Sequence, residues 1–265
     1  MKKKKIVLTF LILAAVCVGM GQPAIAAHHE GGERQYYEIR TYSFSNTDQH
    51  SVVENYWENA AIPAMKKLGV GPVGVFTEFN PEQEVKTPRL VVLISYASLE
   101  QFATITDQLN ADEAYLKAGA AYLKADEESP AYDRIESSLV HAFHAMPQLK
   151  GPGTDKDRIF EMREYEGHSE HSSNVKVQMF EEVEVELFVE TGMTGVFYGR
   201  TLVGKNLPSL FYMLAFDDLE DKGSDWRGFF ESPEWEKVSG DEKWSEGGVS
   251  GVNSTMLRPT SFSQI

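Results

Sequence analysis

The chain contains an internal repeat. The string YYEIRTY at 36–42 returns as IFEMREY at 159–165. Three later strings return in the same order: VGPVGVF as TGMTGVF, SYASLE as AFDDLE, and ESPAY as ESPEW. Four ordered matches predict two copies of one structural unit. The spacing between the copies falls from 123 to 103 residues along the chain, so the second copy is the shorter.

Hydrophobic periodicity and turn residues predict the order of elements within the first unit. We expect strands at 36–44, 73–79, 90–96 and 138–146, with helices at 47–68 and from 98 to 125. Gly69 ends the first helix, and the SLEQ string at 98–101 resembles a capping box at the start of the second. The order βαββαβ is the ferredoxin-like arrangement. The fold class is therefore α+β.

Two domains follow from this order, at 34–146 and 157–265, joined by the linker PQLKGPGTDK at 147–156. One segment of the second copy is ambiguous. Residues 175–189 alternate like a strand, but Val175, Met179, Val183 and Leu187 also form an i, i+4 stripe. Because the matching segment of the first copy is clearly helical, we predict a helix.

The N-terminus resembles a secretory signal. Four lysines at 2–5 precede an apolar run from Ile6 to Gly19 and the small residues Ala24-Ile25-Ala26. We expect a signal peptide at 1–26 with cleavage after Ala26, and a secreted or periplasmic mature protein. An uncleaved anchor is the alternative, but the run is short of the ~20 residues that span a bilayer. Cleavage also removes Cys17, the single cysteine, and with it any disulfide or thiolate chemistry.

The predicted mature chain is strongly acidic, with 21 basic and 40 acidic side chains and a net charge of −19. Such a chain repels phosphate backbones and anionic headgroups. We therefore expect neither nucleic-acid partners nor membrane binding after cleavage. A small molecule or a protein remains possible as a partner, and so does a homo-oligomer.

The first strand carries the same charged set in both copies. Glu38, Arg40 and Tyr42 share one face, and Glu161, Arg163 and Tyr165 match them. We expect the opposite face, with Tyr37 and Ile39, to pack against helices. The charged faces of two sheets would then give a barrel with a polar lining.

These strings resemble the NIPSNAP family, whose first strand carries a YELRTY-type string. The GVF strings at 74–76 and 195–197 and the SLE at 98–100 are similar to later motifs of that family. The resemblance implies two domains of the dimeric α+β barrel superfamily, paired within one chain. That superfamily also includes cofactor-independent monooxygenases and haem-handling enzymes. The second copy departs from the pattern, since Glu164 stands at the position of Thr41 and Asp217-Asp218 at that of Ala97-Ser98.

The six charged and aromatic residues of the two first strands are the candidate ligand-binding set. In a pocket, an arginine would hold an anion and a tyrosine or glutamate would handle a proton. The alternative is a structural ion-pair network, since buried charges are usually paired.

The histidines give weaker candidates. His141 and His144 lie three apart on the predicted fourth strand and so face opposite sides, which argues against a shared metal. One of them facing the barrel interior would be a base or a haem ligand. His168 and His171, in a predicted loop, are the candidates for zinc, although a solvated loop is the simpler interpretation.

We expect no cofactor and no metal, and a barrel that binds a small molecule or a protein without established catalysis. One alternative is a monooxygenase-like or haem-handling enzyme that uses Arg40, Tyr42 and His141 or His144. A second alternative is a structural pseudo-dimer that forms larger assemblies through exposed strand edges.

Overall fold

A computed structural model describes residues 33–153 and 158–265. The predicted signal peptide at 1–26 lies outside the described residues, and so do positions 154–156 of the predicted linker. Within the described ranges, no helix is both long and apolar enough to cross a membrane.

Each half of the chain folds with the predicted order of strands and helices. The first half contains β1 (Tyr36–Ser43), α1 (Thr47–Tyr56), η1 (Trp57–Ala61), α2 (Ile62–Lys67), β2 (Val73–Phe79), β3 (Leu90–Tyr96), α3 (Leu99–Asn110), α4 (Glu113–Ala118), α5 (Ala120–Leu123) and β4 (Arg134–Ala142). The second half contains β5 (Ile159–Gly167), α6 (Glu170–Met179), η2 (Phe180–Glu184), α7 (Val185–Glu190), β6 (Thr194–Val203), β7 (Ser209–Phe216), α8 (Leu219–Glu231), α9 (Pro233–Ser239), η3 (Glu242–Trp244) and β8 (Val249–Pro259).

The eight strands form one closed antiparallel barrel in the order β1-β3-β2-β8-β5-β7-β6-β4, with β4 paired to β1. The halves meet at two seams, where β4 pairs with β6 and β2 pairs with β8. This confirms the prediction of an α+β fold in which two ferredoxin-like units pair within one chain. Because the barrel is closed, its strands are paired on both sides.

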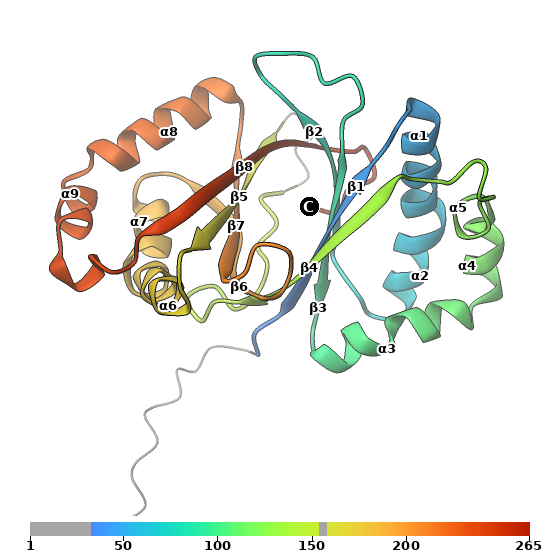
Figure 1. Ribbon diagram of the computed structural model, residues 1–265, viewed down its shortest axis with the longest axis horizontal. Helices are drawn as coiled ribbons and strands as arrows, with labels where there is room; N and C mark the ends of the chain where they lie inside the picture. Colours follow the sequence, from blue (N-terminus) through green and yellow to red (C-terminus); the bar gives the residue numbers. More distant parts are fainter. Residues whose placement is uncertain (1–32, 154–157) are drawn as a thin grey trace, which may run out of the picture. The chain divides into compact units, whose positions relative to one another are not determined.

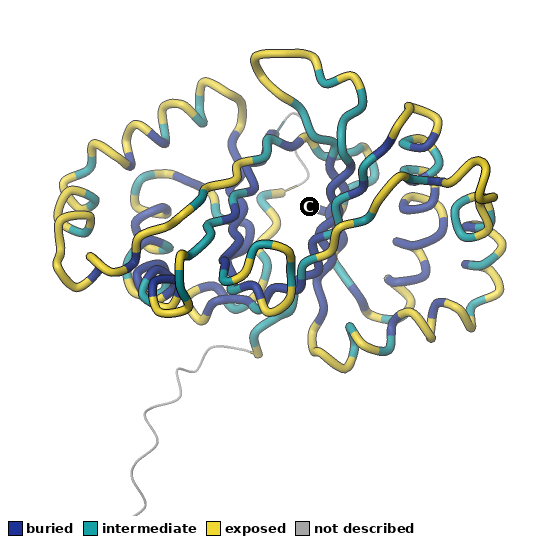
Figure 2. The backbone as a smooth tube through the Cα atoms, viewed as in Figure 1, coloured by how far each residue is buried: buried dark blue, intermediate teal, exposed yellow. Residues whose placement is uncertain are grey.

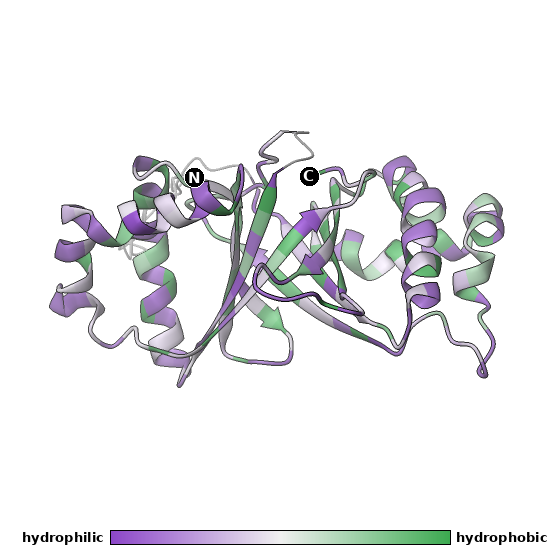
Figure 3. Cartoon of the chain, turned by 90° about the horizontal axis from the view of Figure 1, so that it is seen from above, coloured by the Kyte–Doolittle hydropathy of each residue, from purple (hydrophilic) through white to green (hydrophobic). Residues whose placement is uncertain are grey.

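The helices cover the outside of the barrel. In Figure 1, α1 to α5 lie on one side of the ring of strands and α6 to α9 on the other. Figure 3 shows the same arrangement from above. The burial pattern in Figure 2 follows it, since the strands are mostly buried and the outer turns of the helices are exposed.

The repeat extends to details of the long helices. Asn46 and Ser169 cap the two helices by accepting from the backbone N–H groups three residues on. Each helix contains one π-helical stretch, η1 and η2, at the matching position. Each ends before a glycine with positive φ, 71° at Gly69 and 93° at Gly192. The prediction of a helix across 175–189 is thereby confirmed.

The fourth strand differs from the prediction. It was expected at 138–146, but β4 begins at Arg134 and ends at Ala142. Its first residues are polar and largely exposed, so they lack the apolar pattern that identifies a strand. They nevertheless pair with β1, with Arg134 opposite Ser43 and Glu136 opposite Thr41.

The interior of the barrel is mostly filled by apolar side chains. Tyr37, Phe76, Phe160 and Phe197 pack together there with Ile265 from the end of the chain. The backbone of residues 260–264 continues along β2, which brings Ile265 to this end of the barrel. This end, near the start of β1, is therefore closed.

Candidate functional site

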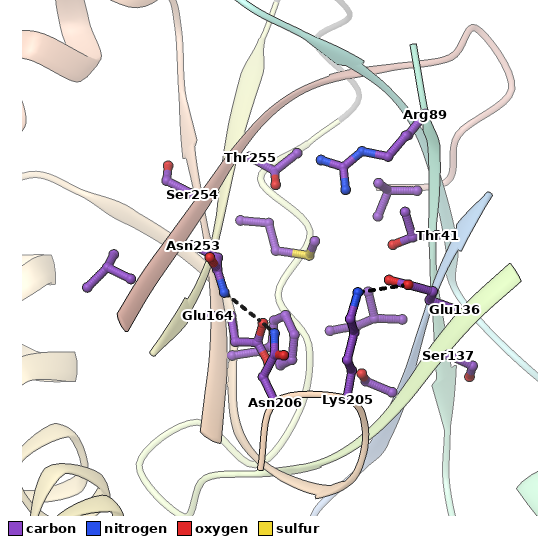
Figure 4. Close-up of a pocket in the computed structure, with 16 residues that line it drawn as sticks. Thr41, Arg89, Glu136, Ser137, Glu164, Lys205, Asn206, Asn253, Ser254 and Thr255 are labelled. Carbon is purple, nitrogen blue, oxygen red and sulfur yellow. Dashed lines mark hydrogen bonds and ion pairs between the residues drawn. The ribbon is translucent and has the colours of Figure 1, made fainter. Parts of the chain in front are cut away.

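The opposite end of the barrel is open and contains a cavity of about 530 Å³. We call it the barrel-mouth cavity. Sixteen residues from both halves line it, and Figure 4 shows them. Its floor is apolar and consists of Ile39, Val91, Met162 and Phe211.

Strand register explains how the two halves build the wall of the cavity. On β1, Thr41 lies between Val91 of β3 and Glu136 of β4. On β5, Glu164 occupies the matching position, between Phe211 of β7 and Asn253 of β8. The departure noted in the sequence, Glu164 for Thr41, therefore places a carboxylate on β5 where β1 has a hydroxyl.

The Glu164 carboxylate is buried, at 8% exposure, and held by neutral donors. Asn206 donates to it at 2.9 Å, Ser209 at 3.1 Å and Asn253 at 3.3 Å. Figure 4 shows Asn206 and Asn253 beside it on one wall. All three donors are neutral side chains.

Two cations lie at the rim. Arg89 donates twice to Glu78, at 2.7 and 2.8 Å, and these hydrogen bonds lower the pKa of Glu78. Lys205, on the β6–β7 loop, lies 2.9 Å from Glu136. Figure 4 shows Lys205 and Glu136 facing one another across the cavity wall. The rim thus combines paired charges with an apolar floor beneath.

The predicted polar face of strand one does not line the barrel, and the assignment of its two faces was wrong. Tyr37 and Ile39 point into the barrel, whereas Glu38, Arg40 and Tyr42 lie on the outer face of the sheet, toward the helices. The reason is that the interior of an eight-stranded barrel is narrow enough for side chains to fill most of it, so its inward positions are mainly apolar.

On the helix side the Glu38–Arg40 pair is satisfied. Glu38 accepts from Arg40 at 2.6 and 3.0 Å, from Ser137 at 2.8 Å and from Tyr96 at 3.1 Å. The Arg40 guanidinium also lies over the Trp57 ring, at 5.8 Å. Burial works to lower the pKa of Arg40, but Glu38 outweighs it and the pKa is raised. This geometry matches the structural ion-pair network.

The second copy repeats the network with other partners. Glu161 accepts from Trp226 and Ser254, both at 2.7 Å, and lies 3.6 Å from Arg163. The Arg163 guanidinium lies over the Trp226 ring at 4.6 Å. Tyr165 accepts a hydrogen bond from Tyr212 at 2.8 Å, and burial raises its pKa.

Neither His141 nor His144 faces the barrel interior, so the predicted role there as a base or haem ligand has no geometric support. Val140 and Ala142 are the inward residues of β4. His141 lies on the outer face, stacked on Tyr36 at 4.3 Å. His144 lies beyond the end of the strand, exposed, 3.2 Å from Glu181.

The two candidate zinc ligands lie apart from the cavity. His168 is exposed before α6, and His171, in the first turn of α6, lies 2.7 Å from the exposed Glu246. Across the described ranges, no group of three His, Cys, Asp or Glu side chains is arranged to hold a metal ion.

Comparison with known sequences identifies the family. The sequence profile of NIPSNAP matches residues 37–144 and again 160–264. The chain belongs to the NIPSNAP family. The two matched segments coincide with the two halves of the barrel, so this NIPSNAP protein contains both partners of the pair in one chain. Among curated proteins, none matches it significantly.

Solved structures support the same fold. A candidate monooxygenase from Fusobacterium nucleatum aligns with a TM-score of 0.56 at 10% identity, over 86% of this chain and 93% of that chain. A candidate monooxygenase from Lactobacillus acidophilus gives 0.53 at 7% identity, over 86% and 94%. A NIPSNAP-like domain protein from Burkholderia xenovorans gives 0.37 at 22% identity, over 42% of this chain and 91% of its own. At these identities the likeness to the two candidate monooxygenases concerns the fold alone.

Most residues of the barrel-mouth cavity were not predicted from the sequence. Arg89, Lys205 and Asn206 lie in loops or at strand ends, where no periodicity marks them. The sequence did indicate Glu164, because this charged residue stands where the first copy has Thr41.

Proposed function

We propose that this NIPSNAP protein binds a small amphipathic organic molecule in the barrel-mouth cavity. The observation that supports this is a cavity that residues of both halves line, with an apolar floor beneath a polar rim. Its volume of about 530 Å³ lies within the usual range for small-molecule sites, roughly 300–1,000 Å³.

The floor sets the apolar part of the ligand. Met162, Phe211, Ile39 and Val91 all line the cavity and belong to one buried apolar cluster, so a ring or short chain would rest on apolar side chains. Burying apolar surface contributes about 25 cal/mol per Å² to binding. Methionine adapts its shape to such ligands, because its side chain is unbranched.

The charged side chains of the rim determine which polar head group the ligand would carry. Lys205 and Glu136 are 67% and 47% exposed, so their ion pair contributes only about 0–1 kcal/mol. A carboxylate, sulfonate or phenolate on the ligand can therefore replace Glu136 as the partner of Lys205 at little cost. Glu164, already held by three donors, stays on the wall as an acceptor for a ligand hydroxyl.

The test uses 8-anilinonaphthalene-1-sulfonate, a fluorescent probe with an apolar body and an anionic head. Saturable one-to-one binding is expected for the full chain. Ser138 lines the cavity, so Ser138→Phe fills it and should weaken binding at least about tenfold. Val189→Phe adds the same ring at an exposed helix position and should leave binding unchanged. Equal binding by the wild type and Ser138→Phe would contradict the proposal.

A second candidate function is cofactor-independent oxygenation of the bound molecule. It is favoured by Glu164, a buried carboxylate at the cavity wall that can accept a proton from a substrate hydroxyl. The two candidate monooxygenases that align over the whole barrel share the fold only. Oxygen uptake with a hydroxylated naphthalene or anthracene tests it: the rate should exceed the uncatalysed one and fall in Glu164→Gln.

The other expectations from the sequence remain proposals. The proposal that the protein is exported rests on its N-terminal sequence alone. Assembly through exposed strand edges is not proposed further, because every strand of the described barrel is paired on both sides.

A further inference from the structure

Four basic side chains gather on the outer face of the barrel at the seam between β4 and β6. On β4, His141 lies between Tyr36 of β1 and Arg200 of β6. Its ring stacks on Tyr36 with an interplanar angle of 1°. We call Arg34, His141, His144 and Arg200 the seam cluster.

The two arginines of the seam cluster bond to neutral groups. The Arg34 guanidinium donates to the carbonyl oxygen of Ala142 at 3.2 Å and lies 3.4 Å from the His144 ring. The Arg200 guanidinium donates to the amide oxygen of Asn174. Within the described part of the chain, neither arginine forms an ion pair with a carboxylate. This is unexpected in a chain with 40 acidic and 25 basic residues.

One carboxylate, Glu181, contacts the seam cluster, but its oxygens are already engaged. It accepts from the backbone N–H groups of His144 at 2.8 Å and Ala145 at 2.7 Å, and from the His144 ring at 3.2 Å. Glu181 therefore fixes the loop that carries His144. Within the described residues it forms no direct ion pair with Arg34 or Arg200, although its charge works to raise the pKa of Arg200.

The other seam of the barrel supplies a comparison. There Arg258 of β8 lies opposite Thr77 of β2, the positions that match His141 and Arg200. The Arg258 guanidinium rests on the Phe79 ring, 4.0 Å from its centroid. Only the seam between β4 and β6 therefore places a second cation across from the first.

We propose that the seam cluster is an anion-binding site that takes a tetrahedral oxyanion of the phosphate type. Such an ion relieves the repulsion between neighbouring cations and accepts several charge-assisted hydrogen bonds at once. The seam cluster shares no residue with the barrel-mouth cavity, so this proposal is independent of the proposed function.

The environment of His141 agrees with this assignment. Burial, with the neighbouring Arg34 and His144, lowers its pKa to about 4. Arg200 and the anionic Glu181 also face this region, from β6 and η2. A bound oxyanion would offset the charge of the neighbouring Arg34 and favour the protonated His141 ring.

Calorimetric titration of the full chain with inorganic phosphate, at constant ionic strength set by sodium chloride, tests the site. Saturable binding is expected. Arg200→Gln should weaken it about tenfold, the loss of one charge-assisted hydrogen bond. Arg258→Gln removes the same charge at the other seam and should leave binding within about twofold of the wild type.

A measurement on the unmodified chain keeps the test independent of variants that fold poorly. In ¹H NMR, the ring protons of His141 and His144 should shift with phosphate and not with equal chloride, while those of His171 stay unchanged. Equal weakening by Arg200→Gln and Arg258→Gln would show screening of bulk charge and overturn the site. So would histidine signals that fail to move at saturating phosphate.

Discussion

A buried ion pair in the second half offers the sharpest test of how the two halves differ. Lys176 in α6 and Glu184 in η2 form an ion pair with side-chain exposures of 11% and 3%. At the same two positions the first half has Val53 and Ala61, both completely buried. The same two positions therefore hold a buried ion pair in the second half and two apolar side chains in the first.

The expected loss of stability follows from the free-energy cost of leaving one buried charge without a partner. In Glu184→Leu the ammonium loses its partner, and holding a lysine neutral at pH 7 costs at most about 4.6 kcal/mol. The rings of Tyr165, Phe180 and Trp235, 5.2–5.9 Å away, still attract the ammonium. We therefore expect a loss of about 3–4 kcal/mol.

The companion variants complete a double-mutant cycle. Lys176→Met leaves the Glu184 carboxyl without its partner, and burial raises the pKa of this group. Protonating a carboxyl at pH 7 costs at most about 3.7 kcal/mol. Replacing both residues, as Lys176→Met with Glu184→Leu, keeps the volume and removes both charges. That double variant should be as stable as the wild type or more stable by about 1–4 kcal/mol.

Urea unfolding followed by circular dichroism at pH 7 measures these free energies. Lys243→Met is the control, because its pair with Glu182 is about half exposed (52% and 48%) and should contribute only about 0–1 kcal/mol. Single variants that lose less than about 1 kcal/mol, or a double variant that loses the sum of both, would refute the reasoning.

The pH dependence of Lys176→Met gives a second readout. Without the ammonium, the folded pKa of Glu184 stays above its unfolded value, since burial raises it. Its cost to stability is therefore absent below the unfolded pKa and grows as pH rises through the folded one. The stability deficit of Lys176→Met should be smaller at pH 5 than at pH 8.

Three further predictions concern single positions. Gly199→Ala should lower the free energy of unfolding by at least about 1–3 kcal/mol, because the added Cβ would lie 2.6 Å from the carbonyl oxygen of His141. Gly223 lies in open space within α8, so Gly223→Ala should stabilise the protein by about 0.5–1 kcal/mol in the same unfolding assay. The pKa of His141 is about 4 in the folded protein and about 6.5 in the unfolded chain, so stability should fall as pH falls from 6.5 to 4 in phosphate-free buffer. In His141→Gln the melting temperature should fall less over this range. A melting temperature that depends on pH equally in both proteins would contradict this prediction. Finally, N-terminal sequencing of the exported protein should begin at Ala27, and retention of residues 1–26 would contradict cleavage after Ala26.

Much of the fold was predictable because the sequence contains it twice. The strand-like alternation of 175–189 would have misled a local reading, and the first copy corrected it. The start of β4 was misplaced because Arg134 and Glu136 are polar on a strand that pairs at an open barrel end. No apolar pattern marks such residues.

The orientation of strand one was not predictable from alternation alone. Both of its faces are buried, one in the barrel and one under helices, so neither is plainly the solvent side. Charged Glu38 and Arg40 suggested a polar interior, but they are stabilised by each other, by Ser137 and by Tyr96. Ser137 belongs to β4 and Tyr96 to β3, and only the folded barrel reveals that these two strands pair with β1.

The barrel-mouth cavity was accessible only in part. Glu164 stood out as a break in the repeat, whereas Arg89 and Lys205 reach the rim from segments that carry no pattern. Their convergence depends on barrel closure, which brings β3 and the β6–β7 loop to the same opening.

The most direct test of the account is a crystal structure of the protein purified without denaturation and soaked with the anilinonaphthalene probe. We predict density for an organic molecule over Met162 and Phe211, with its anionic end toward Lys205. A cavity that holds only water, with the probe bound elsewhere on the chain, would contradict the claim that this NIPSNAP barrel is a small-molecule binding site.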